Sequence, residues 1–168
     1  VDASYSMGFV GSDRSRIDRA KEQAKQLVAR SVQGDGFSLL TMADPPRSII
    51  GAVAFAGEDV QQEIESLSLT HAGASLLATL DEIERVLQSA ETEHPRFAKQ
   101  RVCFISDLGR TTWDDALSTE GRQRIGRLAE RAALTLIDVG ETPSMNLAIA
   151  RLATENALPV VREPVALD

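Results

Sequence analysis

The sequence predicts a three-layer, doubly wound (Rossmann-like) α/β fold, in which helices cover both faces of a mainly parallel sheet with one antiparallel edge hairpin. Segments with apolar residues at helical spacing alternate along the chain with short, continuous apolar runs, which are typical of buried strands. A hydrophobic content of 43% and a charged content of 26% are those of a folded domain and argue against disorder.

The first half of the chain contains two predicted helices and the hairpin. Residues 16–30 have the apolar spacing of an amphipathic helix. The apolar runs at 37–43 and 47–55 are joined by three residues, too few for a parallel crossover, so they predict an antiparallel pair. Residues 58–67 predict a short helix with acidic residues at its N-terminus.

The second half continues the alternation. The predicted elements are a helix at 75–88, a polar connector at 89–100, a strand at 101–107, a helix at 122–133 and a strand at 134–140. We place the domain at residues 1–143. The remainder, 144–168, changes character: 146–152 is expected to close the sheet as an edge strand, and 159–167 to begin a following β-rich domain. Val1 directly precedes a motif that requires a strand before it, so we expect a segment of a longer protein with its first strand truncated.

Charge and composition exclude several kinds of partner. A net charge of −7 argues against nucleic acid, since neutralising phosphates requires a basic face. No run approaches the ~18 apolar residues of a membrane span, so direct membrane insertion of this segment is not expected.

The single cysteine, Cys103, excludes an internal disulfide, and its apolar neighbours predict a buried core thiol. The two histidines, His71 and His94, lie in polar loops and predict solvated positions.

Oxygen-bearing side chains gather where the predicted strands end. Asp2, Ser4 and Ser6 alternate along an extended segment, so their side chains point the same way. Asp107 ends a later strand, and ligands of open parallel sheets bind outside the carboxyl ends of the strands. Two acids and two hydroxyls are hard ligands that favour Mg²⁺, Mn²⁺ or Ca²⁺. The spacing therefore predicts part of a metal cup, open toward an outside carboxylate.

The segment DASYS at 2–6 resembles the DxSxS signature of the von Willebrand factor type A domain, where it begins a metal-ion-dependent adhesion site. The order of elements from residue 1 to about 140 resembles that family as well, including a strand that ends in ISD. The resemblance implies that Ser4 and Ser6 ligate the ion directly. Asp2 and Asp107 would then contact the ion through water molecules or accept hydrogen bonds from its direct ligands. The resemblance also implies a partner protein whose acidic side chain completes the metal shell.

One position departs from the family pattern. The threonine expected in the loop before the third helix aligns with Ala74 in HAGASLLATL, which has no side-chain oxygen. Two roles are open for the neighbouring Ser75, as the helix N-cap or as an additional ligand. We therefore expect metal binding to be weak or absent.

The overall pattern is similar to bacterial membrane-anchored members of the family, which implies a soluble domain of such a protein.

These features favour a non-enzymatic interaction module, an adhesion or scaffold domain. The alternative from another class is a phosphoryl hydrolase of the haloacid dehalogenase type, with Asp2 as nucleophile and Asp114 and Asp115 as distal acids. Such enzymes usually place a second acid two residues after the nucleophile, where this chain has Ser4. A degenerate, metal-free scaffold is the third hypothesis. Trp113 is expected to be a packing anchor.

Overall fold

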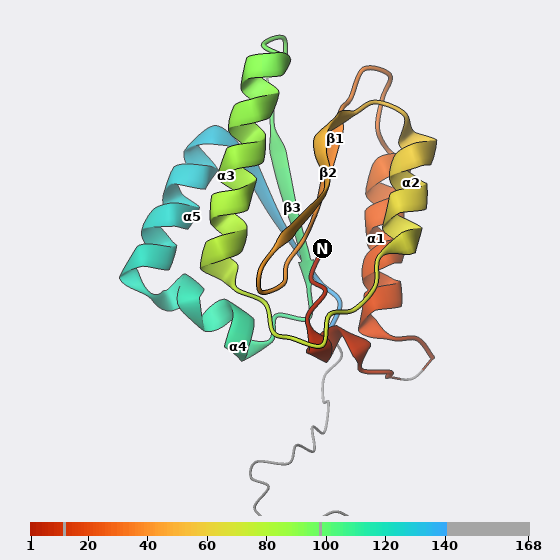
Figure 1. The fold of residues 1–168 in the computed structure, drawn as a ribbon, viewed down its shortest axis with the longest axis vertical. Coiled ribbons are helices and arrows are strands. Elements are labelled where there is room, and N and C mark those ends of the chain that lie inside the picture. The colour runs from red at the N-terminus through yellow and green to blue at the C-terminus, as the bar shows by residue number, and fades with distance from the viewer. Residues whose placement is uncertain (12, 98, 141–168) are drawn as a thin grey trace, which may run out of the picture.

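The computed structural model describes residues 1–11, 13–97 and 99–140, whose helices lie on both sides of a central sheet (Figure 1). One face is covered by α1 (Arg16–Ala29) and α2 (Gly57–Ser66), and the other by α3 (Leu76–Glu93) and α5 (Thr119–Arg131). The predicted three-layer α/β fold is confirmed. Within these residues, no helix has the length and apolarity needed to span a membrane.

The strands form two pairs of different direction. β1 (Phe37–Thr41) and β2 (Arg47–Ala54) are antiparallel, so the predicted hairpin is confirmed. β3 (Arg101–Ser106) pairs in parallel with β4 (Ala133–Asp138). A parallel pair requires a long crossover connection, which α4 (Arg110–Trp113), η2 (Asp114–Leu117) and α5 supply here.

Residues 1–3 join the two pairs into one layer. The Asp2 N–H donates to the Ile105 carbonyl at 2.8 Å, and the Met42 N–H donates to the Val1 carbonyl at 2.8 Å. Asp2 and Met42 form a parallel bridge. The order across the sheet is therefore β2, β1, residues 1–3, β3, β4, which leads the N-terminal motif to the carboxyl edge at its centre.

The core follows the predicted periodicities on both sides of this sheet. Ser15 caps α1 by accepting the Asp18 N–H at 3.2 Å, and the apolar stripe of α1 faces the sheet. On β3, Phe104 packs toward α3 and α5, whereas the next residue, Ile105, packs toward α1 and α2. Successive strand residues point to opposite faces, so one strand supports both halves of the core.

Several boundaries differ from the sequence-based expectations. α3 continues to Glu93, five residues into the predicted connector, because its polar last turns lie on the solvent side, where Ser89 Oγ donates to Glu93 Oε1 at 2.8 Å. α5 begins at Thr119, capped by Ser118. Two short helical turns were not predicted, η1 (Tyr5–Gly8) and α4, whereas Asp114 and Asp115 begin a helical turn, η2, as expected. The strands expected at 146–152 and 159–167 and the boundary at 143/144 lie outside the described residues.

Beside Val1, on the side away from the carboxyl edge, a mainly apolar slot separates β1 from β3. The slot has a volume of about 1030 Å³ and opens between the two strands and the helices that cover them. Its lining includes Leu39, Val102, Cys103 and Phe104. Cys103 is half-buried rather than fully buried as predicted, because it faces this slot; burial raises the pKa of its thiol.

Candidate functional site

The serine pair of the N-terminal motif lies at the carboxyl edge of the sheet. The chain leaves the strand segment at Ala3 and turns into η1, which brings Ser4 Oγ and Ser6 Oγ to 3.1 Å from each other, within hydrogen-bond distance. Asp2 lies behind them, 0% exposed, and its Oδ1 accepts the Ser4 N–H at 2.9 Å. We call Asp2, Ser4, Ser6 and Asp107 the serine cup.

Ser106 joins the two halves of the serine cup, and its role was not predicted. Its hydroxyl donates to Asp2 Oδ2 at 2.6 Å and accepts the Leu108 N–H at 3.1 Å and the Trp113 Nε1–H at 3.0 Å. One donor and two lone pairs are then all engaged. Trp113 also packs edge-to-face on Phe104 at 5.6 Å, which confirms it as a packing anchor.

The loop after β3 carries the second acid into the serine cup. Leu108 has a φ of 55°, a backbone conformation uncommon for a non-glycine residue, and the turn lets Asp107 Oδ1 accept the Gly109 N–H at 3.1 Å. A Cβ on Gly109 would stand 3.3 Å from Asp107 Oδ1 and 3.7 Å from Ser6 Oγ. Gly109 therefore keeps open a small space that Asp107 and Ser6 share, so the predicted convergence of the two segments is observed.

Arg16 is a member of this site that the sequence interpretation missed. It begins α1, and its Nη1 donates to Asp107 Oδ2 at 2.6 Å and to the Ser6 carbonyl at 3.3 Å. The side chains of Arg16 and Asp107 are only 8% and 2% exposed. Arg16 lies four residues before Ala20, on the buried stripe of α1, and this placement was the available signal.

The loop before α3 forms the remaining wall. The Thr70 N–H donates to the Ala3 carbonyl at 2.8 Å, and the Tyr5 N–H donates to the Ala72 carbonyl at 3.0 Å. The methyl group of Ala74 packs against the core under α3. Ser75 caps α3 by accepting the Ala78 N–H at 3.3 Å, so of its two open roles the structure shows the capping one.

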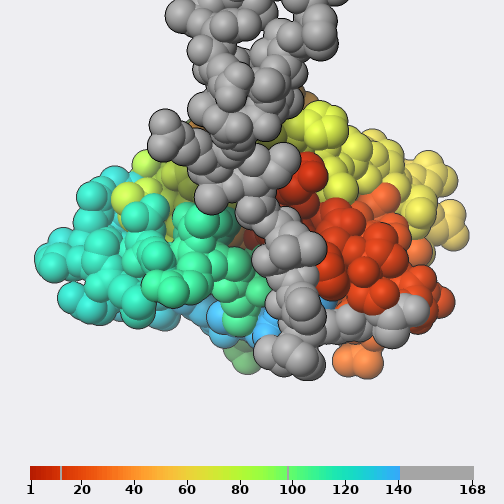
Figure 2. Space-filling model, turned by 90° about the horizontal axis from the view of Figure 1, so that it is seen from below, coloured from red at the N-terminus to blue at the C-terminus, as the bar shows by residue number. Residues whose placement is uncertain are grey.

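Figure 2 looks onto this edge of the molecule, where the N-terminal segment, the loop before α3 and the α4 region meet. Tyr5 is 73% exposed here, and His71 and Arg110 are exposed as well. His94 lies away from this edge, half-buried against Phe55 and Phe97, so its expected solvated position is only partly correct.

The donor set of the serine cup partly suits a hard cation. Two hydroxyl oxygens 3.1 Å apart and a nearby carboxylate are the right chemical types. The described residues hold no cluster of three or more His, Cys, Asp or Glu side chains arranged for a metal, so an ion here would depend on the hydroxyls. Arg16 already pairs with Asp107, and Ala74 offers no oxygen.

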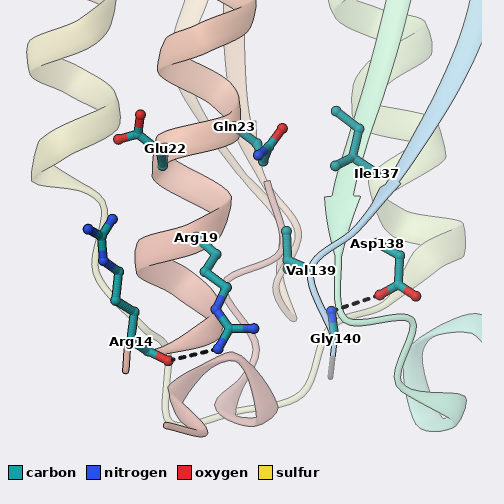
Figure 3. A pocket seen from close by; sticks show the side chains of 8 residues that line it. All are labelled: Arg14, Arg19, Glu22, Gln23, Ile137, Asp138, Val139 and Gly140. Atoms are coloured by element: carbon teal, nitrogen blue, oxygen red, sulfur yellow. Dashed lines mark hydrogen bonds between the residues drawn. The ribbon is translucent and has the colours of Figure 1, made fainter. Parts of the chain in front are cut away.

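A hollow of about 340 Å³ lies at the same edge of the sheet as the serine cup, between the start of α1 and the end of β4 (Figure 3). The Gly140 N–H donates to Asp138 Oδ1 at 2.7 Å, and Arg19 Nη2 donates to the Arg14 carbonyl at 3.4 Å. Charges of both signs line this hollow, so it selects no single ligand chemistry. Its lining is Arg14, Arg19, Glu22, Gln23, Ile137, Asp138, Val139 and Gly140.

Comparisons with known proteins agree with this geometry. The sequence profile of the von Willebrand factor type A domain matches residues 1–110. Among solved structures, the chain is similar to an aerotolerance-related membrane protein from Bacteroides fragilis NCTC 9343 with multiple mutations to serines, at a TM-score of 0.63 and 16% identity over 99% of this chain and 77% of that one. It is also similar to the conserved hypothetical protein BatB from Bacteroides thetaiotaomicron, at a TM-score of 0.51 and 14% identity over 82% of this chain and 87% of that one. No curated protein matches the chain.

Proposed function

Because this chain belongs to the von Willebrand factor type A family, whose domains are generally protein-interaction modules, we propose that it binds a partner protein through the serine cup. The observation that carries the proposal is the pair of hydroxyls of Ser4 and Ser6, 3.1 Å apart beside the buried carboxylate of Asp107. The proposed partner group is an acidic side chain, which approaches from outside the carboxyl edge of the sheet.

A weakly held divalent ion, Mg²⁺ or else Mn²⁺ or Ca²⁺, is part of this proposal. Ser4 and Ser6 would hold it, with Asp2 and Asp107 as acceptors for its water ligands. The ion would supply positive charge that attracts the partner's carboxylate. Weak affinity is expected because Ala74 contributes no oxygen and Asp107 is already paired with Arg16.

The rim of the serine cup supports a protein partner rather than a small molecule. Tyr5 is 73% exposed at the rim, and exposed aromatic side chains of this kind often contribute strongly to interfaces. The exposed Arg110 and His71 add donors that suit an acidic partner. In this chain the rim therefore offers an anchor and complementary charge around the serine cup.

The phosphoryl hydrolase alternative gains no support from the site. Asp2 would have to attack a phosphorus atom, but it is 0% exposed, and its two oxygens accept bonds from the Ser4 N–H and the Ser106 hydroxyl. The metal-free scaffold is favoured by a specific observation, the Arg16–Asp107 pair, and it remains the second candidate.

The neighbour from Bacteroides fragilis is named an aerotolerance-related membrane protein, and on this basis we also propose that this domain is part of a membrane-anchored protein.

The test combines metal titration with a carboxylate probe. Calorimetry with Mg²⁺, Mn²⁺ and Ca²⁺ compares the wild-type chain with the double variant Ser4→Ala, Ser6→Ala; heat in the first that is lost in the second supports the site. Peptide arrays then compare acidic peptides with their Asn and Gln counterparts. Binding that requires both the carboxylate and the two serines supports the module, and binding that persists in the double variant contradicts it.

A further inference from the structure

A cation already stands in the serine cup, the guanidinium of Arg16. Its Nη1 lies 2.6 Å from Asp107 Oδ2 and 3.3 Å from the Ser6 carbonyl oxygen. The ion pair is buried, with the two side chains 8% and 2% exposed, so solvent screens it little. The positive charge of Arg16 thus neutralises the acid that a divalent ion would need.

The groups around Arg16 stabilise its positive charge but do not pair all of its N–H donors. Its Cζ lies 4.7 Å from the centroid of the Phe9 ring, a cation–π contact. Its Nε is buried and has no hydrogen-bond partner among the residues that the structure describes. Buried donors are normally paired, so Arg16 is held mainly by charge, through Asp107 and Phe9.

We propose that Arg16 is the resident cation of the serine cup, which competes with a divalent ion for Asp107 and keeps the affinity for that ion low. This inference rests on the metal-holding role proposed for Ser4 and Ser6. A divalent ion placed beside the two hydroxyls would face the repulsion of a buried guanidinium, and repulsion between charges is strong where water is excluded. Removing the guanidinium charge frees Asp107 to favour the ion.

The test variant is Arg16→Gln, whose amide can still donate a hydrogen bond but carries no charge. Its matched control is Arg30→Gln, the same change at the exposed C-terminal end of α1. We expect Mg²⁺ affinity, measured by calorimetry, to rise about tenfold or more in Arg16→Gln and to stay unchanged in Arg30→Gln. Saturating Mg²⁺ should also raise the melting temperature of Arg16→Gln by more than that of the wild type.

The outcomes separate this inference from the proposed function. If Arg16→Gln binds Mg²⁺ no more tightly than the wild type, including the case in which neither binds, the inference is overturned. If Arg16→Gln binds Mg²⁺ and the wild type does not, the inference stands and the metal role fails in the native serine cup.

A second variant covers the case in which Arg16→Gln fails to fold. Arg16→Lys keeps the positive charge but loses the planar fork. The proposal requires its Mg²⁺ affinity to stay at the wild-type value, and tighter binding in this variant contradicts it.

Discussion

The surroundings of residues 1–3 differ at the two ends of this segment, both in the polarity of the side chains and in how fully the space is filled. Toward the carboxyl edge, Asp2 is 0% exposed and each of its oxygens has a donor, from Ser4 and from Ser106. Toward the opposite edge, a mainly apolar slot of about 1030 Å³ lies between β1 and β3. At the polar end each oxygen of the buried Asp2 carboxylate has its partner, whereas the lining of the slot includes Gln100, whose buried Oε1 has no hydrogen-bond partner among the described residues.

The largest expected effect comes from breaking the polar end. Asp2→Ala leaves the Ser106 hydroxyl and the Ser4 N–H without their buried acceptor and should lower the free energy of unfolding by about 3 kcal/mol. Urea denaturation measures it. The control is Asp59→Ala on the exposed side of α2, with an expected change within about 1 kcal/mol. Equal losses in the two variants would show that Asp2 does not hold the serine cup together.

A matched pair of core truncations sharpens the contrast at the apolar end. Leu80 is 1% exposed in the closed core under α3, whereas Leu39 is 7% exposed and lines the slot. Leu80→Ala should cost about 3 kcal/mol and Leu39→Ala about 2, because a side chain beside an existing void already lacks part of its contacts. Equal costs, measured by urea denaturation, would show that the slot closes in solution.

The smallest expected effect adds an oxygen to the polar end. Ala74→Thr restores the side-chain oxygen that the family pattern has at this position and should tighten Mg²⁺ binding by about tenfold, or ~1.4 kcal/mol. Ala72→Thr is the control, because it adds the same group two residues earlier on the same loop, where Ala72 is exposed. Unchanged affinity in Ala74→Thr, measured by calorimetry, would show that this loop is misaligned with the family pattern.

Local patterns predicted much of the candidate site. The alternation of Asp2, Ser4 and Ser6 placed the oxygens together, and the end of β3 placed Asp107 beside them. The capping role of Ser75 was recognisable from its position before a helix. Local composition misplaced the end of α3, because a polar segment at a helix end looks the same in sequence as a connector.

The sequence by itself determined the alternation of elements, the hairpin and the convergence of the oxygen-bearing motif, since periodicity and turn length act over a few residues. Only the tertiary structure decided that Ser106 bonds Asp2 across 104 positions and that Arg16 pairs with Asp107 across 91. Such partners depend on how β3 and α1 are placed against residues 1–3, and no local spacing encodes that register. Packing, and not local spacing, therefore decided that a positively charged side chain lies beside Asp107 in the serine cup.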